Sequence, residues 1–217
     1  MTRYALAALF VLGHLAPGFA QAPAPSDGTA TASYIRAKPE QMLEVYPREV
    51  VTRVFSNEFT EARRSKVMST IQGAPGVNCP ERPNVVAYAV IPFKLGKDQT
   101  TWIERYAVGC DKAIGRNFLV ILEPAGVKLL ELVRGATRTD PFLQRDLGGP
   151  VGGIAQSRRP QGCQSHIIAD TAITQQPPQG GGPWVEKWDI AACDHRSSIE
   201  ITFTPSAQGG TTWNIKP

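Results

Sequence analysis

Residues 184–193, Trp-Val-Glu-Lys-Trp-Asp-Ile-Ala-Ala-Cys, carry a pattern that also stands earlier in the chain, at residues 102–110, Trp-Ile-Glu-Arg-Tyr-Ala-Val-Gly-Cys. In both stretches a glutamate lies between two aromatic residues at alternate positions, a basic residue follows it, and a cysteine comes a few residues later. Alternate residues of a strand share one face, so each stretch should hold its glutamate and two aromatic side chains together. The two triads are Trp102, Glu104 and Tyr106, and Trp184, Glu186 and Trp188. The recurrence predicts a duplicated structural unit.

The surroundings of the two motifs match as well. Residues 84–91 (NVVAYAVI) align with residues 166–173 (HIIADTAI) at an offset of 82, the same as the offset between the motifs (184 − 102). A third and a fourth apolar strand are predicted after each cysteine, separated by turn residues. Their ranges are 117–122 and 127–133 in the first half, and 198–204 and 211–215 in the second. The fold class we predict is α+β, with two tandem related modules. Each is a short helix plus a three- or four-stranded antiparallel β-meander with one internal disulfide.

Helical segments are expected ahead of the strands. Residues 57–72 place Phe59, Ala62, Val67 and Ile71 at roughly helical spacing and end before a glycine, which predicts an amphipathic helix. Residues 40–43 are predicted as a short helix, whereas the β-branched run 50–55 is predicted to be extended. The corresponding region of the second half, from Asp140-Pro141 onward, is rich in glycine. One or two irregular turns are therefore expected there.

The N-terminus has the features of a secretory signal: Arg3, an apolar stretch over residues 4–16 and a small-x-small site that predicts cleavage after Ala20. Residues 21–33 are rich in Pro, Ala, Ser and Thr and are predicted to be a disordered linker. Module 1 is then assigned to residues 34–138 and module 2 to residues 139–217. No apolar run after Pro25 reaches the roughly 20 residues of a membrane span. We therefore expect an exported protein, periplasmic or extracellular, without stable membrane insertion.

The charge of the chain is small. The formal net charge is +4, and it falls to +3 when Arg3 is removed with the signal. Lys and Arg are scattered, without the basic stripe and interleaved aromatic residues of a nucleic-acid groove. Nucleic acid is therefore excluded as an expected partner.

Four cysteines follow the predicted cleavage site. An even number in an exported chain favours disulfides, and four cysteines allow three pairings. The repeat selects one pairing because the spacings within the two halves are similar, 31 (110 − 79) and 30 (193 − 163). It predicts the bridges Cys79–Cys110 and Cys163–Cys193. Zinc binding is disfavoured because no Cys-x-x-Cys pair exists.

Glu104 and Glu186 are the candidate chemical residues, with two interpretations. Two converging carboxylates are the apparatus of glycoside hydrolysis; alternatively, each glutamate pairs across strands with a Lys or Arg while the aromatic residues cover a core. A third possibility is that the six residues of the two triads, together with Trp213, form a binding face. His166 and His195 are not forced together by any spacing, and neither a metal site nor a cofactor is predicted.

The function expected from these observations is non-catalytic binding or scaffolding in the cell envelope, with a cell-envelope or secreted protein as partner. One version is a rigid inhibitor of a secreted enzyme that inserts a loop, residues 93–101 or 175–183, into a cleft. The alternative is a small cell-envelope glycan hydrolase that uses Glu104 and Glu186 as its paired carboxylates.

Overall fold

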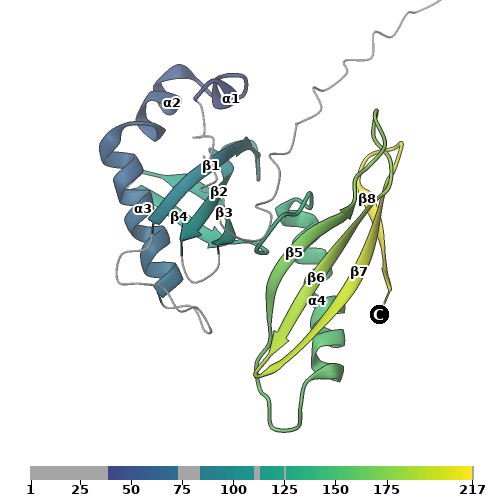
Figure 1. Ribbon diagram of the computed structural model, residues 1–217. Helices are drawn as coiled ribbons and strands as arrows, with labels where there is room; N and C mark the ends of the chain where they lie inside the picture. The colour runs from purple at the N-terminus through teal and green to yellow at the C-terminus, as the bar shows by residue number, and fades with distance from the viewer. Residues whose placement is uncertain (1–38, 73–83, 110–112, 125, 217) are drawn as a thin grey trace, which may run out of the picture.

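The computed structural model describes residues 39–72, 84–109, 113–124 and 126–216. Within them the fold is α+β and contains two antiparallel four-stranded sheets, each with helices on one face (Figure 1). The first half contains α1 (Glu40–Leu43), α2 (Arg48–Val54), α3 (Asn57–Gln72), β1 (Asn84–Pro92), β2 (Thr101–Gly109), β3 (Ala113–Glu123) and β4 (Gly126–Glu131). The second half contains α4 (Pro141–Arg158), β5 (Ile167–Gln175), β6 (Trp184–Ala192), β7 (His195–Pro205) and β8 (Thr211–Lys216). The predicted signal peptide, the predicted linker and the predicted Cys79–Cys110 bridge lie outside the described residues.

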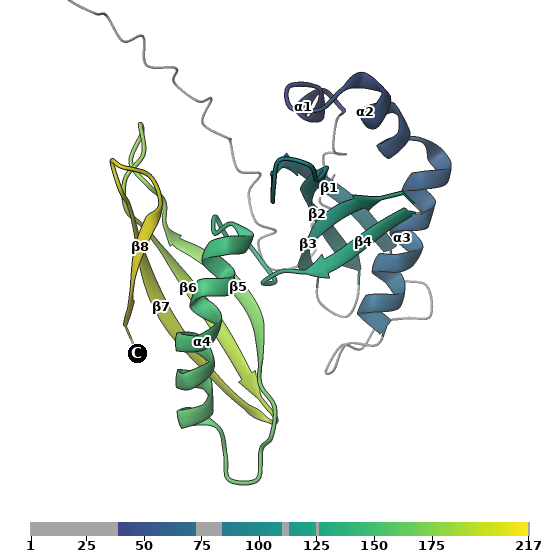
Figure 2. The same ribbon diagram turned by 180° about the vertical axis from the view of Figure 1, so that it is seen from behind.

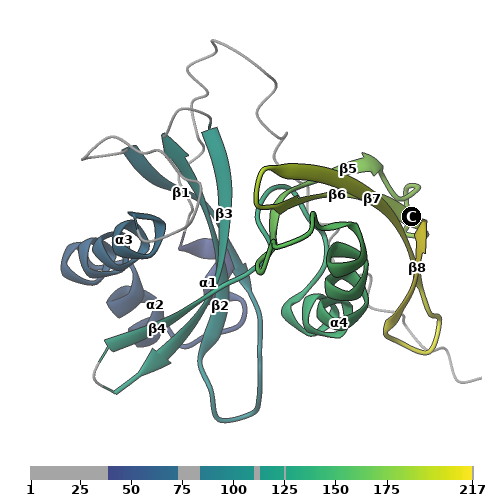
Figure 3. The ribbon, with the colours of Figure 1, turned by 90° about the horizontal axis from the view of Figure 1, so that it is seen from below.

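The first sheet is a meander in the order β1-β2-β3-β4, in which each strand pairs with the next one along the chain. The even-numbered residues of β2 lie on one face of this sheet, and the three N-terminal helices cover that face (Figure 3). Met42 and Val54 from α1 and α2 pack against Trp102 at one end of this face. At the other end α3 packs against Tyr106 and its neighbours.

The second sheet repeats this arrangement in the order β5-β6-β7-β8. In β6 buried and half-buried residues alternate strictly, as expected for a strand with one covered face. Helix α4 lies across that face (Figure 2), and its contacts come from Leu147, Val151 and Ala155, a row at spacing four. The opposite face of β7 is exposed to solvent.

Two of the predictions for helical and extended segments were wrong. Residues 141–158 form one continuous helix, although irregular turns were expected after Asp140. The side chain of Asp140 caps this helix by accepting a hydrogen bond from Leu143 N at 2.8 Å. The four helical glycines cost about 1 kcal/mol each relative to alanine and Pro150 costs more, but burying Leu147 and Val151 contributes about 1.5–3 kcal/mol each, and Leu143 and Ile154 add partly buried apolar area. Packing therefore outweighs local propensity.

The other wrong prediction concerns the valine-rich stretch after Pro47, which is the helix α2 rather than an extended segment. Val51 and Val54 lie one helical turn apart, and both are buried in the core beside Trp102. Propensity for β-structure is a weak preference that tertiary contacts override.

Helix α3 has the predicted bounds, but its buried face differs from the predicted one. Phe59, Val67 and Ile71 do face the sheet, whereas Ala62 is exposed. The position between Phe59 and Val67 at spacing four belongs to Arg63, which is only 4% exposed. A cation thus enters the apolar core of the first half.

The segment between β4 and α4 connects the two sheets through main-chain hydrogen bonds. Leu132 N and Gly135 N donate to carbonyl oxygens of β3 at 2.8 and 2.9 Å, and Ala136 N donates to Thr171 O of β5 at 2.8 Å. Gly135 has a φ of +85°, and a Cβ added there would stand 2.1 Å from Asp170 Oδ1. Only glycine fits at this contact.

The predicted bridge Cys163–Cys193 is present, with a Cα–Cα distance of 6.0 Å. It ties the connection that follows α4 to the turn between β6 and β7. Within the described residues, none of the helices combines the length and apolar character that crossing a membrane requires.

Candidate functional site

Glu104 is held at the centre of the first sheet's covered face and is fully buried. Its neighbours at two residues on either side donate to it: Trp102 Nε1 to Oε1 at 2.8 Å, and the Tyr106 hydroxyl to Oε2 at 2.5 Å. Arg63 Nε lies 3.0 Å from Oε1 and forms a buried ion pair. The same guanidinium donates from Nη1 to Val54 O at 2.5 Å. One carboxylate therefore joins β2 to α3 and, through Arg63, to the end of α2.

Glu186 occupies the corresponding place in the second sheet and is also fully buried. Trp184 Nε1 and Trp188 Nε1 each donate to one of its oxygens at 2.9 Å. The other donors come from the segment between the sheets: Thr137 Oγ1 at 2.7 Å and Arg138 N at 2.8 Å. Four uncharged donors surround this carboxylate, where Glu104 has two such donors and one cation.

The electrostatic effect of the first carboxylate is visible at Tyr106. Burial, and then the negative charge of Glu104, hold the pKa of the Tyr106 hydroxyl well above its ordinary value of 10.0. Tyr106 therefore remains a hydrogen-bond donor to Glu104 across the physiological pH range.

The sequence predicted both triads, and the structure brings the members of each triad together. No hydrogen-bond partner is common to Glu104 and Glu186 in the described part of the chain, and each lies in the helix-covered layer of its own sheet. The aromatic residues of both triads are buried; the most exposed of them, Trp184, is 7% exposed. Neither the carboxylates nor the aromatic rings meet solvent, so a ligand reaches them only if a sheet and its covering segments separate.

The remaining predicted positions do not assemble into a second site. His166 and His195 are exposed, and no group of three His, Cys, Asp or Glu side chains among the described residues could hold a metal ion. Of the two candidate loops, the first is anchored. Phe93 O accepts from the Thr101 side chain at 2.5 Å and from Tyr46 at 3.2 Å, and the Phe93 ring lies 5.5 Å from that of Phe142. The second loop, which follows β5, is largely exposed.

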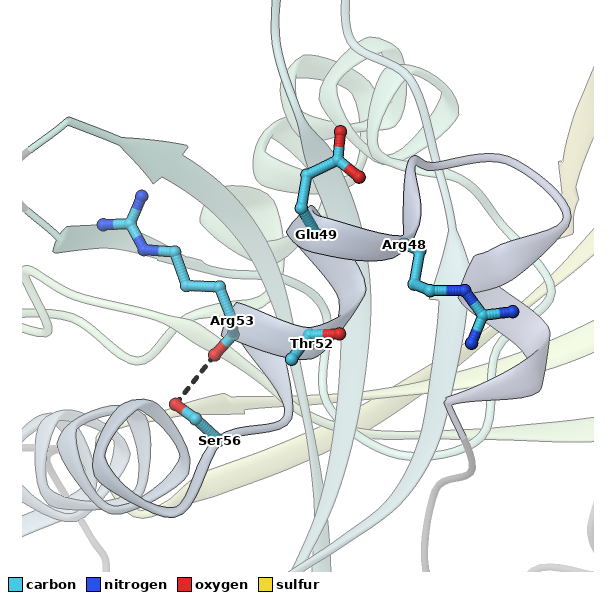
Figure 4. A pocket seen from close by; sticks show the side chains of 5 residues that line it. All are labelled: Arg48, Glu49, Thr52, Arg53 and Ser56. Atoms are coloured by element: carbon cyan, nitrogen blue, oxygen red, sulfur yellow. Dashed lines mark hydrogen bonds between the residues drawn. The ribbon is translucent and has the colours of Figure 1, made fainter.

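The surface has a hollow over α2, drawn in Figure 4. Its lining includes Arg48, Glu49 and Arg53, together with Thr52 and Ser56. The Arg48 and Arg53 side chains extend to opposite sides in the view, so the two cations do not converge on one point. The one hydrogen bond drawn runs from Ser56 Oγ to Arg53 O at 2.9 Å and belongs to the end of the helix. The hollow lacks the converging polar groups of a ligand site.

Sequence reasoning missed the partners of both carboxylates. Arg63 had a detectable signal, because it stands at spacing four between Phe59 and Val67 in the apolar row of α3. Thr137 and Arg138 had none, since a backbone N–H and a hydroxyl of a connecting segment carry no recognisable pattern.

No protein-family model matches this chain, and neither a curated protein nor a solved structure is significantly similar to it.

Proposed function

We propose that this protein is an exported, non-catalytic binding or scaffolding protein of the cell envelope. The observation that carries the proposal is the state of Glu104 and Glu186. Both are fully buried, and their oxygens accept hydrogen bonds from fixed donors within the fold. A general acid or nucleophile must reach its substrate. The repeated motif is thus explained by architecture, and this favours binding over glycan hydrolysis.

Export is supported by the disulfide and by the signal features of the N-terminus. A disulfide such as Cys163–Cys193 persists in oxidising compartments and is rare in the cytosol. Together with the signal features of the N-terminus, it makes the periplasm or the extracellular space the proposed location. The partner we propose is a cell-envelope or secreted protein, met through exposed main chain and loops such as the one after β5.

The test is capture of partners by the mature chain, residues 21–217, from crosslinked envelope extract, with mass spectrometry as the readout. We expect one stoichiometric protein. The matched control baits replace residues 176–182 with a Gly-Ser segment of equal length, or replace residues 206–209 in the turn between β7 and β8 in the same way. Loss of the partner only with the first replacement assigns the contact to that loop.

A different outcome would show that the protein is a glycan hydrolase. If no protein is captured, and the mature chain releases soluble fragments from envelope glycan in a manner that Glu186→Gln abolishes while the variant stays folded, the protein is a hydrolase. Burial of both carboxylates then describes only a closed state.

We also propose that the two halves are copies of one ancestral unit. Their strands have equal lengths in order, 9, 9, 11 and 6 residues, and each meander follows a long helix. Both second strands hold their glutamate through aromatic donors two residues away on either side. The pairing Cys79–Cys110 follows from the same proposal. Peptide mapping without reductant tests it, since a Cys79–Cys163 peptide would contradict the repeat.

A further inference from the structure

The edge strands of the two sheets differ in how they are protected. An unprotected edge presents free main-chain N–H and C=O groups to other strands, and natural edges are blocked by bulges, prolines, charges or covering segments. Strand β1 has a register break between Ala87 and Ala89 and ends at Pro92. On β4, Lys66 Nζ donates to Val127 O at 2.6 Å. Along β5 there are two register breaks, and Thr171 O is occupied by Ala136 N.

Within the described residues, strand β8 has no bulge, no proline and no segment hydrogen-bonded to its outer main-chain groups. Its six residues, Thr-Thr-Trp-Asn-Ile-Lys, pair with β7 without a register break and contain no proline. The single charged residue, Lys216, is at its end. Among the edge strands of the described chain, β8 is therefore the one open to pairing.

The outward-facing groups of β8 follow from its register. Ser206 N donates to Gly210 O at 3.0 Å, which fixes a hydrogen-bonded pair next to the turn. Hydrogen-bonded and non-hydrogen-bonded pairs alternate along an antiparallel ladder. Thr212 and Asn214 therefore bond to β7, and Thr211, Trp213 and Ile215 direct their N–H and C=O groups away from the sheet.

The side chains at this edge are apolar on the side of α4. Trp213 pairs with Phe203, which pairs with Trp184, so three aromatic residues form one row across the sheet. The rings of Trp184 and Phe203 stack with centroids 4.9 Å apart. Trp184 and Phe203 are 7% and 0% exposed, whereas Trp213 is 37% exposed. Trp213, the residue of this row at the open edge, is thus partly exposed.

From this arrangement we infer that β8 pairs antiparallel with β8 of a second copy of this chain. With Trp213 opposite Trp213 of the copy, Thr211 stands opposite Ile215, and every outward N–H and C=O of these three residues finds a partner. The same register continues the aromatic row into the copy and places both α4 helices on one side of an eight-stranded sheet.

Charge is compatible with this pairing. Lys216 falls opposite position 210, a glycine, so no like charges oppose one another along the seam. The contact is isologous, as a twofold symmetric dimer requires. The inference does not depend on the proposed function.

Sedimentation velocity of the mature chain over about 1–100 µM tests the inference, because a dimer whose dissociation constant lies in that range changes from mostly monomer to mostly dimer across it. We expect a monomer–dimer equilibrium. Trp213→Lys should weaken the dimer at least tenfold, because it opposes two ammonium groups at the seam. Thr202→Lys adds the same charge to an exposed site one strand further in and should leave the dimer unchanged. Near-ultraviolet circular dichroism confirms that each variant is folded.

A crosslinking experiment tests the register. In the inferred pairing Thr212 lies opposite Asn214 of the copy. A mixture of Thr212→Cys and Asn214→Cys chains should give a covalent dimer under mild oxidation, and neither variant alone should. A chain that stays monomeric at 100 µM, a dimer equally tight with Trp213→Lys and Thr202→Lys, or equal crosslinking of the single variants would each overturn the inference.

Discussion

Replacing Glu186 by glutamine keeps the size of the side chain and changes only its charge and one acceptor. In the wild type the carboxylate accepts from four donors: the two indole N–H groups, Thr137 Oγ1 and Arg138 N. The amide oxygen of glutamine can keep two of them, but its NH2 group then faces the other two donors. The Thr137 hydroxyl can rotate and accept instead, whereas an indole or a backbone N–H cannot.

The substitution therefore strands one or two buried donors and removes hydrogen bonds to a charged group. Each stranded donor costs about 1–3 kcal/mol, so Glu186→Gln should lower the free energy of unfolding by about 2–4 kcal/mol. That is a large part of the roughly 5–15 kcal/mol of a typical domain. Glu186→Ala would leave both indole N–H groups and Arg138 N without an acceptor, and we expect that variant to fold poorly.

Urea denaturation followed by tryptophan fluorescence measures this difference, provided that the m-value is unchanged. The control is Glu200→Gln, which makes the same chemical change on the exposed face of β7. Surface changes of this kind stay within about 0.5 kcal/mol. If Glu186→Gln is as mild as the control, the carboxylate does not organise the fold, and a structural role no longer accounts for the buried glutamate.

Three further outcomes are expected. Arg63→Met should destabilise the protein by about 3–5 kcal/mol in the same assay, because it leaves a buried carboxylate without its cation. Arg64→Met, at a side chain that is 46% exposed, should cost less than about 0.5 kcal/mol; equal effects would refute the ion-pair argument. Cys163→Ala combined with Cys193→Ala should cost about 3–4 kcal/mol on the chain-entropy model for a separation of 30 residues, and an unchanged urea midpoint would contradict this. The raised pKa of Tyr106 means that the unfolded chain loses its proton first as the pH rises through 10.0. Stability should therefore fall above that pH, and Tyr106→Phe should reduce the fall.

The strands were largely predictable from the sequence, and the contacts of the glutamates were not. The aromatic residues at alternate positions around Glu104 and Glu186 predicted the strands β2 and β6. The offset shared by the two halves predicted the neighbouring strands. Helix α2 was missed because its valines suit a strand locally, and only their contacts with the core beside Trp102 decide for a helix. Helix α4 was missed for the corresponding reason, since its glycines and Pro150 obscure a buried row that the second sheet selects.

The sequence predicted which residues make up the candidate site, but it left open whether they are buried in a core or exposed to a ligand. That Trp, Glu and aromatic residues would meet on one face follows from strand geometry alone. Whether such a group opens to solvent depends on what covers the sheet, and here the covering residues come from α3 and from the segment around Thr137. Those distant segments lie outside any local pattern.

The segment that joins the sheets makes the two buried glutamates differ in the parts of the chain they depend on. The partners of Glu104 all belong to the first half, so β2 can complete its core as soon as that half has emerged. Glu186 instead needs Thr137 and Arg138, whose segment is hydrogen-bonded to β3. Pairing in both meanders is between neighbours in sequence, which favours fast local closure. The buried carboxylate of the C-terminal half therefore depends on a segment that is also bonded to the N-terminal half, whereas the printed partners of Glu104 all lie in the N-terminal half.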